Sequence, residues 1–403
     1  MRHCKTSRQE LWLSVLICVA GLPGLADPLT DQAKLTAGNT GFAFELFQQI
    51  VREQPDANVF ISPFSVSTLL LMLDNGAAGE TKQELERVLH TDGLSAGALN
   101  AACERLNQSL NSQTNVILEL ANAIWYKQGI PLKPGFVSVN RDFFRAELAG
   151  VNFDSPQSAQ TINNWADRNT HGKIRQVVQW PFDPATRVVL ANAIYFKGKW
   201  DLPFNKQETK PHAFHPAGGG DEPVPTMWRH SHFDYQHGDG FQAVRLPYAG
   251  KRLWMDVFLP DSNSSLTNLL ARFNAGSERN KMLEGFLDRE GTLALPRFKL
   301  EYDIRLNDSL QVLGLKHAFH EADFSAMADE PLEVSEVKQK SYVEVNEEGT
   351  EAAAVTVGIV RATAIFRPLE PFEMIVDRPF FFVIEDSQTQ SILFMGVVFD
   401  PVK

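Results

Sequence analysis

One serine of this chain has the spacing of a catalytic nucleophile. Gly93, Ser95 and Gly97 match the Gly-x-Ser-x-Gly pattern, in which a sharp turn from a strand to a helix exposes a serine for acyl transfer. Here residues 84–90 have a helical pattern, and the serine follows them in a short connection of small residues. The sequence therefore favours an ordinary loop over a catalytic serine.

A group of histidines offers a second chemistry, because histidine is a common zinc ligand. Neither Cys nor a carboxylate stands at ligand spacing from them, and nearby Pro and Gly residues indicate exposed hairpins. We therefore predict no metal site. The histidines are His212, His215, His230, His232 and His237.

The sequence contains no Walker loop, no dinucleotide fingerprint and no His-Glu-x-x-His motif. The expectation is thus a protein that is not an enzyme and that needs no cofactor.

The third candidate chemistry belongs to a stretch of backbone. Residues 352–358 are small and uncharged, and no proline follows Glu351 until Pro368. Such a segment can exist as a loop or as a strand. As a strand it would turn its small side chains to one face and Glu351 to the other, since side chains alternate. Composition alone leaves a simple linker or an ordinary strand open.

Length and composition indicate one large folded domain. The chain has 403 residues, of which 44% are hydrophobic and 22% charged. No linker rich in Gly, Ser or Pro divides it, so a single domain over residues 27–403 is the simplest organisation. The formal net charge of -11 provides no basic surface for phosphate contacts, and nucleic acid is not an expected partner.

The first residues have the pattern of a secretory signal peptide. Three cations, at Arg2, Lys5 and Arg8, precede an apolar run over residues 11–25 that ends in small residues before a cut after Ala26. The alternative is an uncleaved membrane anchor, for which the run is short and interrupted by Gly and Pro. We predict that residues 1–26 are removed and that the protein is secreted to an extracellular location, or to the periplasm if the source is bacterial, without a membrane anchor.

Three cysteines, Cys4, Cys18 and Cys103, cannot build a disulfide framework. Cys103 follows two alanines in a helical pattern, so it is expected to be a packed side chain rather than a nucleophile.

Helical patterns predominate early in the chain and strand patterns later. Helices are predicted over residues 40–53 and 65–73, the second after the start signal Ser62-Pro63 with its proline in the first turn. Another helix should begin near Thr81, capped by that hydroxyl with Glu84 reaching back. Short apolar runs predict strands at residues 116–125, 188–195, 253–259, 292–300, 341–345 and 380–384.

Several motifs give the chain a resemblance to the serpin family over about residues 33–403. They are Asn58-Val59-Phe60-Ile61-Ser62-Pro63-Phe64-Ser65, Gly76-Ala77-Ala78-Gly79-Glu80-Thr81, Ile162-Asn163-Asn164-Trp165, Thr170-His171-Gly172-Lys173-Ile174, the run 190–200 (LANAIYFKGKW), the run 345–354 (VNEEGTEAAA) and the run 377–384 (DRPFFFVI). The resemblance implies an α+β fold with three β-sheets, eight or nine helices and an exposed reactive-centre loop at about residues 347–371.

The resemblance also implies a mechanism. A serine protease cleaves the loop, and the acyl-enzyme is trapped when the loop inserts as a new strand of the main sheet. The hinge residues that match the inhibitory pattern are Glu347, Gly349, Thr350, Ala352, Ala353 and Ala354. Thr350 is expected to be exposed before insertion and buried after it. The alternative is a non-inhibitory relative that acts as a carrier or chaperone.

The bait residue follows from the usual length of the family's loop. Counting from Glu347 places the reactive bond between Thr363 and Ala364, with Arg361 and Ala362 as alternative bait residues because the following stretch is longer than usual. A small bait residue suits an elastase-like or subtilisin-like protease, whereas Arg361 suits a trypsin-like one.

Two further expectations concern partners. The helix that binds heparin in some relatives should lie near residues 101–112, where Arg105 is the sole Lys or Arg, so activation by heparin is not expected. The protein is expected to be a monomer.

Overall fold

The structure is a computed structural model that describes residues 28–111, 116–350 and 370–402. Within these ranges the helices are α1 (Pro28–Glu53), α2 (Pro63–Asp74), α3 (Gly79–Val88), α4 (Ala96–Asn111), α5 (Pro134–Phe144), α6 (Pro156–Asn169), α7 (Leu266–Arg272), α8 (Gly276–Glu284) and α9 (Asn307–Val312), with a 3-10 turn at Lys206–Glu208. The strands are β1 (Val59–Ile61), β2 (Val116–Lys127), β3 (Glu147–Val151), β4 (Val188–Lys199), β5 (Lys210–Phe214), β6 (Glu222–Gly238), β7 (Phe241–Pro247), β8 (Leu253–Pro260), β9 (Leu287–Pro296), β10 (Phe298–Arg305), β11 (Val334–Asn346), β12 (Gly349–Thr350), β13 (Phe372–Ile375), β14 (Phe380–Asp386) and β15 (Ser391–Val398). The α+β class predicted from the sequence is confirmed.

The described strands form two hydrogen-bonded sheets. The larger has the order β1-β15-β14-β8-β7-β6-β9-β13, with β5 paired to β6, and the smaller has the order β10-β11-β12-β4-β2-β3. The long strand β6 pairs with β5 and β9, and its C-terminal part pairs with β7. Strand β6 therefore joins one group of strands, β5, β9 and β13, to another, β7, β8, β14, β15 and β1. Because β6 is unbroken, two of the three expected sheets form one continuous sheet.

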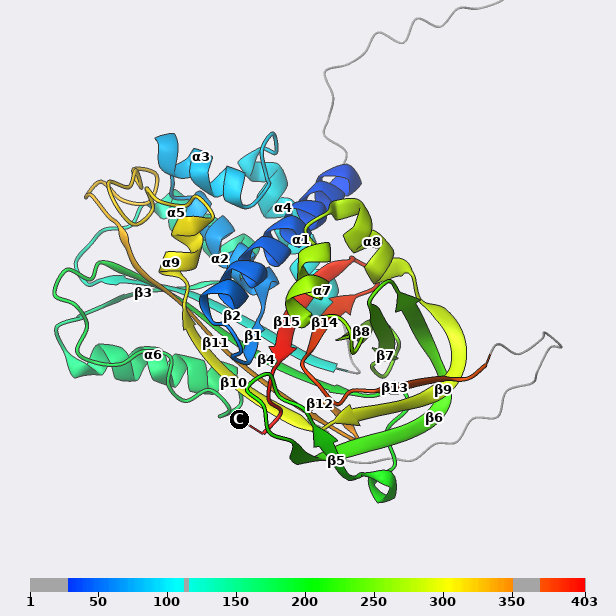
Figure 1. Ribbon diagram of the computed structural model, residues 1–403. Helices are drawn as coiled ribbons and strands as arrows, with labels where there is room; N and C mark the ends of the chain where they lie inside the picture. Colours follow the sequence, from blue (N-terminus) through cyan, green and yellow to red (C-terminus); the bar gives the residue numbers. More distant parts are fainter. Residues whose placement is uncertain (1–27, 112–115, 351–369, 403) are drawn as a thin grey trace, which may run out of the picture.

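The six-stranded sheet is the centre of the molecule, and we call it the central sheet. Helix α6 lies across one of its faces (Figure 1), where Ile162 and Trp165 pack against Ala123, Trp125 and Ala191. The opposite face, with Ile124, Leu190 and Ile194, joins the main core that includes α1 and α2. Both faces of β4 are therefore buried, as expected of a near-continuous apolar strand.

Local signals account for the start of α2. Ser62 accepts a hydrogen bond from the Ser65 amide, and Pro63 occupies the first turn, so the predicted start is confirmed. The predicted capping box at Thr81 is wrong. Glu84 instead accepts hydrogen bonds from the Lys316 and His317 amides, because α3 packs against that distant segment.

Cys103 is buried on α4, and burial raises the pKa of its thiol to about 12. The prediction of an inert, packed thiol is confirmed. Among the helices that the structure describes, none is both long and apolar enough to cross a membrane.

Candidate functional site

The hinge begins at the end of β11 in the central sheet. After Asn346 the chain turns through Glu347 and Glu348 and re-enters the sheet as β12, between β11 and β4. Thr350 is opposite Val345 on β11 and Gly198 on β4, and β12 runs antiparallel to both neighbours. The first hinge residues therefore already occupy the position of an added strand.

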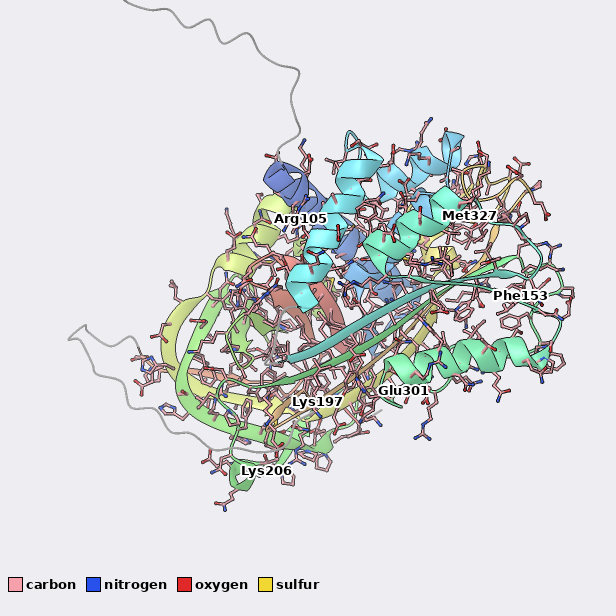
Figure 2. The ribbon with its side chains drawn as sticks, turned by 180° about the vertical axis from the view of Figure 1, so that it is seen from behind. Arg105, Phe153, Lys197, Lys206, Glu301 and Met327 are labelled. Carbon is pink, nitrogen blue, oxygen red and sulfur yellow. The ribbon has the colours of Figure 1, made fainter. Side chains whose placement is uncertain are left out.

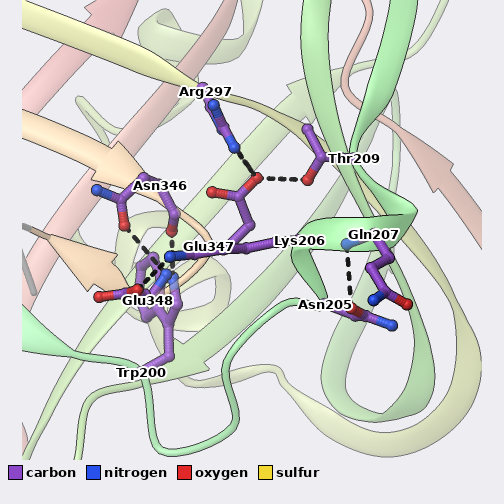
Figure 3. Close-up of polar contacts among 9 residues, drawn as sticks. All are labelled: Trp200, Asn205, Lys206, Gln207, Thr209, Arg297, Asn346, Glu347 and Glu348. Atoms are coloured by element: carbon purple, nitrogen blue, oxygen red, sulfur yellow. Dashed lines mark hydrogen bonds and ion pairs between the residues drawn. The ribbon is translucent and has the colours of Figure 1, made fainter. Parts of the chain in front are cut away.

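Side chains from two other segments hold the buried Glu347 carboxylate in the turn (Figure 3). Its side chain is 2% exposed, and its Oε1 accepts hydrogen bonds from Arg297 Nε at 2.8 Å and from the Thr209 hydroxyl. Burial alone would raise the pKa of Glu347, but the hydrogen bonds from Arg297 and Thr209 outweigh it, so the pKa lies below its ordinary value. The carboxylate is consequently ionised at neutral pH, and it binds the turn to the junction between β9 and β10, where Arg297 lies, and to Thr209 just before β5.

Backbone groups of the turn are also satisfied by the segment that follows β4. The Trp200 amide donates to Glu348 O at 3.0 Å, the Phe204 amide donates to Glu347 O at 2.8 Å, and Trp200 Nε1 donates to Asn346 O at 3.0 Å. Lys206 forms an ion pair with Glu348. These contacts fix the direction in which the chain leaves β11.

Thr350 is buried, contrary to the sequence-based prediction of an exposed residue. Its exposed fraction is 0%, and its Oγ1 lies 2.8 Å from the Tyr248 hydroxyl. The prediction is wrong because the turn after β11 consists of Glu347 and Glu348 alone, so Gly349 and Thr350 already lie in the sheet.

Gly349 is required by geometry at this entry point. Its φ of 142° is a conformation that residues with a side chain rarely adopt, and a Cβ there would lie 2.2 Å from Gly198 O. Glycine thus allows β12 to approach β4 closely.

Below β12 the central sheet is closed. β11 and β4 pair directly in parallel register from Val334 opposite Val188 to Tyr342 opposite Tyr195. Midway, Gln339 Nε2 donates to Ser62 O and to Asn192 Oδ1, each at 3.0 Å. Further insertion of the hinge would have to part these two strands and this buried polar network.

The remaining hinge and bait residues of the sequence analysis lie outside the described residues. They are Ala352, Ala353, Ala354, Arg361, Ala362, Thr363 and Ala364, together with the expected signal peptide at residues 1–26.

Ser95 lies in the connection between α3 and α4, where its Oγ accepts a hydrogen bond from the Ala98 amide at 3.3 Å. No strand precedes it in that connection, so the loop interpretation is confirmed for this serine and the nucleophile elbow is wrong.

Four of the five histidines do have a carboxylate beside them, but each carboxylate is too far away in sequence to have been recognised from the spacing. His230 Nε2 is 3.3 Å from Glu290 Oε1, and His232 Nδ1 is 3.4 Å from Asp288 Oδ2, across the β6–β9 pairing. His215 and His237 pair with Asp221 and Asp261. These are one-to-one pairs, and in the described part of the chain no three His, Cys, Asp or Glu side chains converge as metal ligands.

Arg105 lies on α4, in the upper part of the view in Figure 2, whereas Lys206, the ion-pair partner of Glu348, lies in the lower part. A ligand of that helix would therefore act on the hinge from a distance.

Four residues of the hinge site were not singled out from the sequence: Thr209, Lys206, Tyr248 and Arg297. A buried acid such as Glu347 demands a cation, but Arg297 is 50 residues away and the sequence has no local feature that selects it. Trp200 belonged to a quoted motif, yet its role as a donor to the turn was not foreseen.

Comparisons with known proteins agree with this architecture. The family described as Serpin (serine protease inhibitor) matches residues 37–401. Iripin-2 of Ixodes ricinus is 38% identical over 91% of this chain and 94% of its own length, and the leukocyte elastase inhibitor of Sus scrofa is 35% identical over 91% of this chain and all of its own.

Two solved structures share the fold. Native protease nexin-1 with heparin has a TM-score of 0.81 at 31% identity, covering 93% of this chain and 100% of that one. Human thyroxine-binding globulin complexed with thyroxine has a TM-score of 0.82 at 26% identity, covering 92% and 99%. The hinge entering between β11 and β4, the match along nearly the whole chain and these relatives lead to one conclusion: the chain belongs to the serpin family.

Proposed function

We propose that this protein is a secreted inhibitor of a serine protease that works as a suicide substrate. The position of Gly349 and Thr350 between β4 and β11 carries the proposal, because it starts an added strand that can continue in the same register once the paired parts of β4 and β11 separate. The target cleaves the loop, and further insertion displaces the acyl-enzyme before it hydrolyses.

The energy for this step comes from completing the sheet. A strand of roughly ten residues adds about ten backbone hydrogen bonds, at about 1 kcal/mol net each before the ordering cost. That gain is comparable to the stability of a domain. The intact form is therefore kinetically trapped.

The proposed target is elastase-like or subtilisin-like, with Thr363–Ala364 as the reactive bond. A small residue at that position suits a small primary pocket, and relatives named leukocyte elastase inhibitor support an elastase-like target. A trypsin-like protease is the target if Arg361 is the bait.

The test is to mix the protein with pancreatic elastase, subtilisin and trypsin separately. A complex that survives denaturing electrophoresis supports inhibition, and mass spectrometry of the released carboxyl-terminal fragment identifies the bond. A fragment that starts at Ala364 supports Thr363 as the bait, and one that starts at Ala362 moves it to Arg361. Cleavage by all three proteases without a complex would favour a carrier, as thyroxine-binding globulin is described to bind thyroxine.

A further inference from the structure

Two buried hydroxyl groups meet where the hinge enters the central sheet. The Tyr248 hydroxyl lies 2.8 Å from Thr350 Oγ1, and both side chains are fully buried. We infer that Tyr248 is a positioning residue: its hydroxyl holds Thr350 between β4 and β11, so that loop insertion starts with its first position already occupied. This inference rests on the proposed inhibitory function.

The tyrosine ring is itself fixed. It stacks on Trp200 with ring centroids 4.7 Å apart and meets Phe196 edge-on at 5.0 Å. Gly198, on the same strand as Phe196, leaves room for the ring, since a Cβ there would lie 2.7 Å from Tyr248 Cδ1. A ring packed in this way has few alternative orientations, so its hydroxyl is a fixed partner for Thr350.

The same aromatic pair holds both sides of the turn. Trp200 donates its ring N–H to Asn346 O and its backbone N–H to Glu348 O, and Tyr248 meets Thr350 two residues later. The turn is thus fixed before and after Gly349 by neighbours that stack on each other.

The backbone pairing of β12 is too short to hold the hinge alone. β12 has two residues, and strand pairs of that length are marginal without side-chain contacts. A buried hydroxyl without a partner also loses its hydrogen bonds to water. The Tyr248–Thr350 contact therefore decides how much of the population has its hinge in the sheet.

This population matters for trapping. Insertion competes with hydrolysis of the acyl-enzyme, and the rate of a step that needs one conformation scales with the fraction of molecules in it. The net contribution of one buried hydrogen bond corresponds to about a fivefold change in an equilibrium. The moles of inhibitor cleaved without trapping, per mole of protease trapped, equal the hydrolysis rate divided by the insertion rate. We expect loss of either hydroxyl to raise this ratio by up to about that factor.

The experiment compares Tyr248→Phe, Thr350→Val, the double variant and Thr350→Ser, all in the full chain. The matched control is Tyr302→Phe on β10. It also removes a tyrosine hydroxyl, one that donates a hydrogen bond to Gln54 Oε1 at 2.9 Å and is only partly buried. For each variant the stoichiometry of inhibition is measured with the protease that the wild type traps, together with the rate of loop cleavage. Hydrogen–deuterium exchange of the peptide spanning residues 346–350 is measured without protease.

We expect Tyr248→Phe and Thr350→Val each to raise the stoichiometry minus one by up to about fivefold and to speed exchange of the hinge amides. The double variant should be no worse than either single one, because both remove the same contact, while Thr350→Ser and Tyr302→Phe stay near wild type. Unchanged stoichiometry and exchange in Tyr248→Phe would overturn the inference and leave the proposed function intact, and so would additive effects in the double variant. If the wild type traps no protease, the proposed function fails, and hydrogen–deuterium exchange alone tests the inference. Equal exchange of the hinge amides in the wild type and in Tyr248→Phe would then overturn it.

Discussion

The Glu347 carboxylate and the Arg297 guanidinium form an asymmetric pair at the base of the hinge. The Glu347 side chain is 2% exposed, whereas the Arg297 side chain is 43% exposed. The carboxylate is almost completely buried and the guanidinium is partly in water. Removal of Arg297 therefore leaves a buried charge, whereas removal of Glu347 leaves a charge that water can reach.

This asymmetry predicts unequal losses of stability. Arg297→Ala leaves a buried carboxylate with only Thr209 as a side-chain donor and should cost about 3–5 kcal/mol. Glu347→Ala leaves a guanidinium that water can reach and should cost about 1–2 kcal/mol. Urea unfolding measures both, and the double variant should be more stable than Arg297→Ala. Equal losses in the two single variants would contradict the assignment.

A second prediction concerns pH and a buried cluster away from the hinge. Arg245 donates to Asp256 Oδ2 at 2.6 Å and to Glu385 Oε1 at 2.8 Å. Burial, reinforced by the Asp256 charge and opposed by Arg245 and the Trp254 ring N–H, raises the pKa of Glu385 to about 8 from an ordinary 4.5. The folded protein therefore keeps a proton that the unfolded chain releases.

The sign follows from linkage. A raised pKa contributes stability that is fully present below pH 4.5 and is lost as the pH rises through about 8. Within that interval one pH unit lowers the free energy of unfolding by up to about 1.4 kcal/mol. Glu385→Gln stays neutral, so its stability should decline less between pH 5 and 8 than that of the wild type. The control is Glu330→Gln, an exposed side chain that is not among the charges raising the pKa of Glu385. A decline in Glu385→Gln equal to the wild type's would refute the raised pKa.

Gly349 and Gly97 should respond oppositely to the same change. Gly349→Ala puts a Cβ against the β4 backbone at a φ of 142° and should destabilise the protein by about 2 kcal/mol. Gly97 lies on α4 with no atom within 4 Å of the added Cβ, so Gly97→Ala should stabilise it by up to about 1 kcal/mol. Thermal unfolding measures both, and a Gly349→Ala variant as stable as wild type would contradict the observed entry geometry.

Thr350→Arg should convert the inhibitor into a substrate. The new charge cannot remain beside the buried Tyr248 ring, so the hinge leaves the sheet, and re-entry would bury an unpaired guanidinium. The variant should fold and be cleaved at the wild-type bond, but its yield of gel-stable protease complex should fall at least tenfold. Unchanged trapping would show that Thr350 does not enter the sheet during inhibition.

Local sequence signals predicted those parts of the molecule that local physics controls. Ser62 and Pro63 marked the start of α2, and the two alanines beside Cys103 indicated a packed helix face. The capping box at Thr81 failed because Glu84 found stronger donors in a segment more than 200 residues away. Here the tertiary hydrogen bonds of Glu84 replaced the local cap.

The candidate site was predictable as a segment but not as a structure. The motif at residues 345–354 located the hinge and placed Gly349 within it. The state of Thr350 was not predictable, because its partner Tyr248 is 102 residues away. Likewise, the carboxylates beside His230 and His232 come from a neighbouring strand that spacing along the chain cannot reveal.

We propose that, after cleavage, the loop completes the sheet between β4 and β11. The direct measurement is the unfolding temperature of the protein cut once within residues 358–365, compared with that of the intact chain. We expect a rise of tens of degrees after cleavage, although a covalent bond has been lost, because the kinetically trapped form relaxes to a more stable one. An unfolding temperature equal to or below that of the intact protein would contradict it.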